Sequence, residues 1–146
     1  MREWESHFTR EYGWPIYAEY RYRLMPHGIG MTHSERLRAA RAFSRPANCM
    51  VAPARHGALP PRKSFLEVVP GGVQLSALRR KTDGSVELRV VEVEGRRHET
   101  ALTLGFRAAA AAETNLLGSK VADAALKHST LRSTVEPWKI HTFALT

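Results

Sequence analysis

Apolar side chains recur at every second position in several short segments of the chain. Residues 73–80 and 102–106 show this alternation, and residues 16–24 carry it over nine positions. A period of two is the pattern of a β-strand with one buried face. The strands expected from this pattern, from β-branched residues and from the placement of turn residues are 16–24, 64–69, 73–80, 86–94, 102–106, 108–112, 131–135 and 138–145.

Turn residues separate these segments. A Thr-Asp-Gly sequence at residues 82–84 predicts a tight turn that joins residues 73–80 and 86–94 in a hairpin, because glycine adopts a positive φ at no steric cost. The apolar phase changes within residues 86–94, which indicates either a bulge or a strand buried on both faces. Pro137 cannot donate to a sheet ladder and therefore marks a break between the last two strands.

Two segments have the composition of a helix. Thr32 and Glu35 have the spacing of a capping box, and the run of Ala, Leu and Arg that continues to Phe43 predicts a helix that Pro46 ends. Residues 108–112 are five alanines, for which propensity alone favours a helix. The strands expected on both sides favour a strand there instead.

Short strands about 8–12 residues apart, with turn residues between them, predict an all-β fold. We expect an antiparallel β-sandwich with one short helix near the N-terminal third. The 146 residues are 43% hydrophobic and 25% charged, which suits one folded core. Residues 1–15 are expected to form an N-terminal arm and residues 16–146 a single sandwich domain. A catalytic (β/α)₈ barrel needs about 250 residues and is excluded by length.

The sequence also bears on the compartment. Cys49 is the single cysteine and cannot form an intramolecular disulfide, so a reducing compartment is expected. Residues 1–15 contain five charged residues and no apolar run, unlike a signal peptide. No segment approaches the roughly 20 apolar residues that cross a bilayer. We therefore expect a cytoplasmic protein without a membrane segment.

A net charge of +8 is the unusual bulk property of the chain. Such a charge attracts nucleic acid, anionic lipid or an acidic partner subunit. The basic residues are spread over expected turns, strand ends and the helix, where they also keep sheet edges from pairing with other chains. This spread argues against nucleic-acid binding, which favours one basic face.

Several motifs follow one another in a distinctive order. They are the loop and helix from Tyr22 to Pro46, the segment from His56 to Phe65, the strands from Val73 to Leu78 and from Leu88 to Gly95, the run from Thr114 to Leu116, and the end from Glu136 to Phe143. Their order and spacing resemble the C-terminal β region of family 38 glycoside hydrolases, the α-mannosidases, although each motif alone is generic. The chain departs from the family at Gly118 and Lys139, where acidic residues are usual.

This resemblance implies a C-terminal β-sandwich of a zinc-dependent α-mannosidase. In that family a zinc ion and an aspartate nucleophile act in a preceding barrel and retain the anomeric configuration through a covalent glycosyl-enzyme. The barrel is not in this sequence, so we expect a fragment, a separate subunit or a degenerate relative. The implied role is structural and substrate-shaping. The implied partners are the catalytic barrel, as a domain or subunit, and a mannose-containing glycan, and self-association of the isolated chain is also expected.

No residue of this chain is expected to be catalytic or to bind a metal. A retaining glycosidase needs two carboxyl groups about 5 Å apart, whereas Asp83 and Asp123 fall in an expected turn and an expected loop. Glu87, Glu92 and Glu94 are interpreted as a solvated strand face paired with arginines.

His27 and His56 are the candidate substrate-binding residues. Both lie in glycine-bearing loops that resemble family loops and could reach a sugar bound to the barrel. No two histidines have the spacing that places two metal ligands on one helix face.

The aromatic residues gathered in residues 1–22 are interpreted as packing anchors, although such rings also stack on sugars. A free-standing carbohydrate-binding module therefore stays an alternative, and a basic nucleic-acid-binding domain a third.

Overall fold

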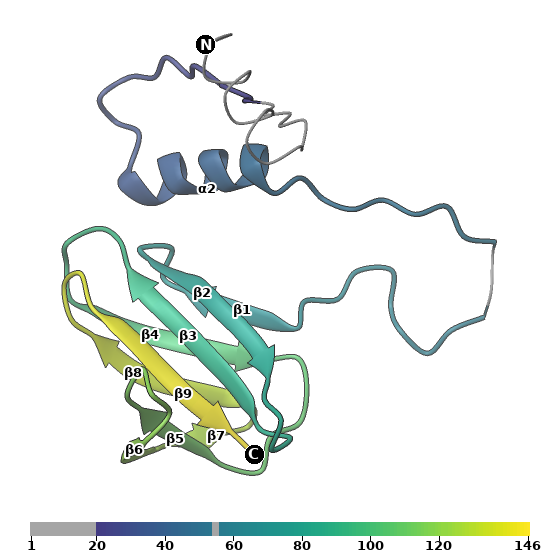
Figure 1. Cartoon of the computed structure of the whole chain (residues 1–146), viewed down its shortest axis with the longest axis vertical. Helices are drawn as coiled ribbons and strands as arrows, with labels where there is room; N and C mark the ends of the chain where they lie inside the picture. Colours follow the sequence, from purple (N-terminus) through teal and green to yellow (C-terminus); the bar gives the residue numbers. More distant parts are fainter. Residues whose placement is uncertain (1–19, 54–55) are drawn as a thin grey trace, which may run out of the picture.

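The computed structural model of the chain describes residues 20–53 and 56–146. Within these residues it contains one helix and nine strands, and Figure 1 shows the strands gathered below the helix. The elements are α2 (His33–Ser44), β1 (Leu66–Val69), β2 (Val73–Arg80), β3 (Val86–Glu92), β4 (His98–Leu104), β5 (Ala111–Thr114), β6 (Lys120–Ala124), β7 (Leu126–Lys127), β8 (Thr130–Val135) and β9 (Ile140–Leu145).

The strands form two sheets that pack face to face. One sheet has the order β1-β4-β8-β7 and the other β2-β3-β9-β5-β6. Every paired strand is antiparallel to its neighbour. The predicted all-β sandwich with one short helix is therefore confirmed.

The core lies between the two sheets and follows from the alternation in the sequence. Leu88 and Phe143 face inward from the adjacent strands β3 and β9, where they are directly opposite in register. Leu102 and Leu131 are likewise opposite each other on β4 and β8. All four side chains are fully buried and belong to one cluster. Burying a side chain of this size contributes about 1.5–3 kcal/mol, so this cluster is the main stabilising feature of the sandwich.

The predicted hairpin is formed by β2 and β3. Gly84 has φ +86°, as the turn requires, and the Lys81 N–H donates to the Ser85 carbonyl at 2.8 Å. The bulge considered for residues 86–94 lies instead in the partner strand β2, and β3 keeps one continuous register with β9. A register shift lies between Leu75 and Ala77 in β2, opposite β3, and β3 itself is a central strand between β2 and β9.

Some expected elements differ from the structure. The strand expected over residues 16–24 is wrong for residues 20–24, which form no strand, and residues 16–19 lie outside the described part. Strand is correct for Ala111 and Ala112 but wrong for residues 108–110, which precede β5. Strands β6 and β7 were not expected from the sequence, and Asp123, which was expected in a loop, lies in β6. The proposed domain boundary at residue 16 also falls outside the described residues and stays a prediction.

Helix α2 begins with the predicted capping box. The Glu35 N–H donates to the Thr32 hydroxyl, and the Glu35 carboxylate accepts from the Thr32 N–H at 2.8 Å. The helix lies across the end of the sandwich at which β2 begins, as Figure 1 shows. Among the residues that the structure describes, no helix is long and apolar enough to cross a membrane.

Candidate functional site

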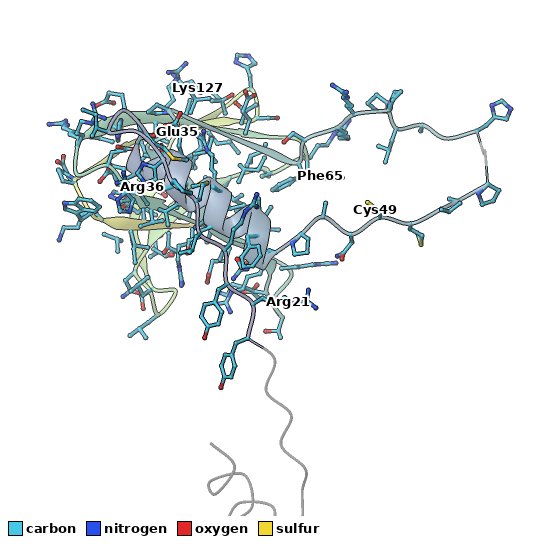
Figure 2. The ribbon with its side chains drawn as sticks, turned by 90° about the horizontal axis from the view of Figure 1, so that it is seen from above. Arg21, Glu35, Arg36, Cys49, Phe65 and Lys127 are labelled. Atoms are coloured by element: carbon cyan, nitrogen blue, oxygen red, sulfur yellow. The ribbon has the colours of Figure 1, made fainter. Side chains whose placement is uncertain are left out.

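The two candidate histidines lie outside the sandwich. His27 is exposed in the loop before α2, where its Nδ1 donates to the carbonyl of the adjacent Gly28 at 2.9 Å. His56 is exposed in the connection between α2 and β1. Cys49 lies on the same connection, which Figure 2 shows extended away from the strands. A role for either histidine in sugar binding stays a prediction.

Polar side chains gather instead at the end of the sandwich that faces α2. Four structural segments meet there: the first turn of α2, the start of β2, the turn between β3 and β4 with its flanking strand ends, and the turn between β8 and β9. Several members of this cluster are buried, which is costly for polar groups unless they are hydrogen-bonded. We call this cluster the polar joint; its residues are Ser34, Gln74, Glu92, Glu94, His98 and Trp138.

Glu92 is the centre of the polar joint and is only 1% exposed. Its carboxylate accepts backbone N–H groups from Glu94 at 2.6 Å, Gly95 at 2.9 Å and Trp138 at 2.9 Å. Burial alone would raise the pKa of the Glu92 carboxyl. The backbone N–H donors, that of Trp138 foremost, outweigh burial and hold its pKa below the ordinary value. The carboxylate is therefore a buried anion that ties two turns together.

His98 lies beside this carboxylate. Its Nε2 is 3.4 Å from Oε1 of Glu92, a separation that makes an ion pair when the ring is protonated. The space for the ring depends on Gly72, because a Cβ at that position would lie 2.5 Å from the same nitrogen. The imidazole and the carboxylate are thus packed against backbone, with no room for a substrate between them.

Hydrogen bonds across the polar joint attach α2 to the sandwich. The Ser34 N–H donates to Oε1 of Glu94 at 2.8 Å, and the Gln74 amide donates to the Ser34 carbonyl at 3.1 Å. Hydrogen bonds from Ser34 hold the pKa of Glu94 below its ordinary value. About two turns further along the helix, Arg41 donates to the Leu75 carbonyl at 3.0 Å.

Trp138 is the exposed aromatic residue of the polar joint. It has φ +60°, a region that a residue with a Cβ rarely adopts. Its ring packs on Gly95, where a Cβ would come within 2.8 Å of the ring, and the His33 ring meets it edge-on at 6.1 Å. The side chain is nevertheless 61% exposed. The donation of its N–H to Glu92 holds this backbone conformation in place.

Residues 72–143 match the sequence profile of the glycosyl hydrolases family 38 C-terminal beta sandwich domain. This part of the chain is a family 38 C-terminal β-sandwich domain. The match runs from the start of β2 into β9, and it covers every residue of the polar joint except Ser34. A search of curated proteins finds no match to the chain.

The structure differs from the interpretation of Glu87, Glu92 and Glu94 as a solvated strand face. Glu87 is paired with arginines, as expected, but it is 5% exposed and lies 3.1 Å from both Arg79 and Arg89. Glu92 points to the opposite face and, among the described residues, makes no ion pair with an arginine side chain. The solvated-face interpretation is therefore wrong for both, because the sheet and its neighbouring turns cover them.

Glu87, Glu92 and Glu94 do not suit the role of the general acid of a glycosidase. General acid catalysis requires a carboxyl group whose pKa is raised, so that it carries a proton near neutral pH. The pKa values of Glu87, Glu92 and Glu94 are all shifted downward, and each carboxylate accepts hydrogen bonds from the protein. These three groups therefore support structure and not proton transfer.

A second carboxylate–imidazole pair escaped the sequence analysis. Nδ1 of His141 on β9 lies 3.1 Å from Oε1 of Glu113 on β5. The two residues are far apart in sequence, and only the pairing of β5 with β9 brings them together. Across residues 20–53 and 56–146, no group of three or more His, Cys, Asp or Glu side chains is placed to hold a metal ion.

Proposed function

We propose that this chain is the structural and substrate-shaping C-terminal portion of a zinc-dependent, retaining α-mannosidase, and that it does not hydrolyse glycosides alone. Membership of residues 72–143 in the family 38 sandwich makes the domain part of a family 38 glycoside hydrolase. The proposal that the substrate is a mannoside comes from the sequence resemblance to the α-mannosidases. The carboxylates of the polar joint support a non-catalytic role, since they are occupied by backbone N–H groups.

Zinc does not fit the described part of this chain. A catalytic zinc site needs three protein ligands and an open position, and the described residues gather no such group. In the proposed enzyme the metal would be held by the catalytic barrel, and no step of the chemistry is assigned to residues of the sandwich.

An open apolar hollow on the sandwich supports a docking role. Its apolar lining is Phe65, Leu78, Val86 and Phe106, beside Arg79 and Arg80, and its volume is about 300 Å³. Figure 2 shows Phe65 at the point where the long connection reaches the strands. Exposed apolar surface of this kind favours contact with another protein surface. The catalytic barrel is the partner that the proposal assigns to it, and self-association is the competing use.

Trp138 is the residue that supports the alternative function, a free-standing carbohydrate-binding module. Its ring is largely exposed and is backed by Gly95, as a platform for a sugar ring would be. This alternative requires that the isolated chain binds mannan and that Trp138→Ala removes the binding. Tyr22→Ala is the matched control, because Tyr22 is also an exposed aromatic residue but lies outside the sandwich.

Release of chromophore from an aryl α-mannoside tests the proposal. The chain is assayed alone, with zinc, and with zinc and the polypeptide encoded immediately upstream. We expect activity only when that polypeptide is present. Hydrolysis by the chain alone would contradict the proposal, and silence in every mixture together with mannan binding would favour the free-standing module.

The same assay tests the two candidate histidines. Replacing His27 and His56 together by alanine is expected to raise KM for the mannoside in the reconstituted enzyme, because both loops are proposed to reach the bound sugar. Ile29→Ala with Leu59→Ala is the control pair, since these exposed residues occupy the same two loops. An unchanged KM in the histidine variant would remove both residues from the substrate site.

A further inference from the structure

Helix α2 is poorly covered for an element of its length. It has 12 residues, and Ser34 is its one buried residue. An isolated helix of this length is marginal in water, and helices in proteins are stabilised chiefly by packing of an apolar face. Among the described residues, the polar joint anchors the first turn of α2 and a separate hydrogen bond to the Leu75 carbonyl holds Arg41, whereas the opposite side of the helix stays open.

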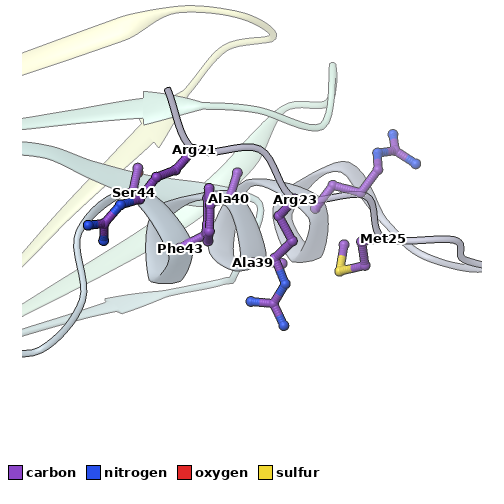
Figure 3. A pocket seen from close by; sticks show the side chains of 8 residues that line it. Arg21, Arg23, Met25, Ala39, Ala40, Phe43 and Ser44 are labelled. Atoms are coloured by element: carbon purple, nitrogen blue, oxygen red, sulfur yellow. The ribbon is translucent and has the colours of Figure 1, made fainter. Parts of the chain in front are cut away.

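That open side carries a groove, which we call the α2 groove. It lies between the helix and the preceding segment, which runs alongside it, as Figure 3 shows. Its volume is about 430 Å³. Met25 and Phe43 give it an apolar lining and are 39% and 38% exposed. The complete lining is Arg21, Arg23, Met25, Arg36, Ala39, Ala40, Phe43 and Ser44.

Positive charge is concentrated around the α2 groove. Residues 20–53 contain six arginines and a single acidic residue, Glu35, whereas residues 64–146 contain eleven basic and nine acidic residues. Glu35 is already used, because its carboxylate accepts hydrogen bonds from Thr32 in the capping box. Of the six arginines, Arg21, Arg23 and Arg36 line the α2 groove. Arg38 and Arg41 instead donate to backbone carbonyls of the sandwich.

Arg36 is held at the groove by the backbone. Its Nη1 donates to the Met31 carbonyl at 2.9 Å, which fixes one edge of the guanidinium. A guanidinium has five N–H donors, so further donors can form paired hydrogen bonds with a carboxylate. Figure 2 shows Arg36 beside the helix and Arg21 on the segment that precedes it.

We infer that the α2 groove is an interaction surface for an acidic polypeptide segment that inserts an apolar side chain. The arginines around the rim complement carboxylates, and the floor formed by Met25 and Phe43 complements an aliphatic or aromatic side chain. Nucleic acid would satisfy the arginines but would leave this apolar floor uncovered. The surface goes beyond the docking role proposed above, which concerns the hollow beside β1 and requires no charged partner.

Fluorescence anisotropy with a labelled peptide tests this surface on the full chain. The probe is a short peptide of glutamates around a central phenylalanine, and its control has glutamine in place of every glutamate. The groove variant is Arg23→Glu with Arg36→Glu. The matched control is Arg107→Glu with Arg132→Glu, which makes the same charge change at exposed positions outside the α2 groove. Phe43→Ser tests the apolar floor, with Leu117→Ser as its exposed control.

We expect the acidic peptide to bind the natural chain and the groove variant to bind it about tenfold more weakly, while the control variant changes affinity much less. Phe43→Ser should weaken binding and Leu117→Ser should not. Equal weakening by both charge variants would overturn the inference, because it would show a general attraction of a basic protein.

Three other results would also overturn it: no binding of the acidic peptide, equal binding of the glutamine peptide, or preferential groove-dependent binding of single-stranded DNA or phosphatidylserine vesicles. Circular dichroism verifies that α2 is retained in each variant. Arg23→Ser with Arg36→Ser replaces the groove variant if the helix is lost.

Discussion

The sandwich buries ten apolar side chains between its two sheets, whereas α2 buries a single residue, the serine Ser34. The sandwich therefore depends on side-chain packing, which is insensitive to charge. Helix α2 depends on hydrogen bonds from a few polar groups and on its own capping box. The two regions should therefore respond differently to substitution. Core changes should unfold the whole molecule, and changes in α2 should stay local.

The largest expected effect is from Phe143→Ala. Phe143 is fully buried and lies opposite Leu88 in the middle of the sandwich. Removing a buried aromatic ring costs about 3–5 kcal/mol, including the cavity that remains. The midpoint of urea unfolding, followed by circular dichroism, should fall accordingly. Leu117→Ala is the control, since Leu117 is almost fully exposed and should leave the midpoint unchanged. Equal midpoints for the two variants would contradict the proposed core.

Glu92→Gln should have the next largest effect. The amide keeps the shape of the side chain but loses the charge and replaces one acceptor oxygen by a donor. The three backbone N–H groups that now meet the carboxylate would then compete for one oxygen. We expect a loss of about 2–3 kcal/mol in the free energy of unfolding.

Glu67→Gln serves as the comparison for Glu92, because Glu67 is an exposed strand glutamate. Its stability change should stay within about 0.5 kcal/mol. If Glu92→Gln were equally mild, the polar joint would not be a stabilising feature.

Acid should weaken the same site. The folded-state pKa of Glu92 lies below the ordinary value of 4.5, so its contribution to stability is fully present above that value. The contribution is lost as pH falls from about 4.5 through the folded-state pKa, because the unfolded chain takes up the proton first. Glu87 and Glu94 shift in the same direction. Between neutral and acidic pH, the midpoint of thermal unfolding should fall less for Glu92→Gln than for the natural chain. An equal fall in both proteins would mean that other groups cause the acid sensitivity.

The sequence predicted the strands with one buried face, because alternation is a local property. It could not predict β6, whose residues Lys120–Ala124 are almost entirely exposed and show no apolar alternation. It predicted a strand at residues 16–24 from the same alternation, yet residues 20–24 form none. Alternation shows that a segment suits a sheet, but a strand also needs a partner for its backbone.

The polar joint was less accessible to sequence reasoning. One signal was present: Glu92 continues the inward phase of Leu88 and Val90, so a carboxylate was placed on a buried face. The partners of this carboxylate could not be predicted, because the Trp138 N–H that donates to it comes from a turn 46 residues away. Buried polar groups are satisfied by tertiary partners, and single-sequence patterns carry no information on those partners.

The smallest expected effect separates α2 from the sandwich. Thr32→Ala removes the hydroxyl of the capping box, which costs about 1 kcal/mol of helix stability. Amide hydrogen exchange should therefore become roughly fivefold faster in α2, while exchange in β3 and β9 stays unchanged. Thr146→Ala is the control, since that residue is exposed, lies far from α2 in sequence and hydrogen-bonds to Ala110 through its backbone. Faster exchange in the core strands as well would mean that α2 and the sandwich unfold as one unit, and that the few hydrogen bonds of the polar joint couple them strongly.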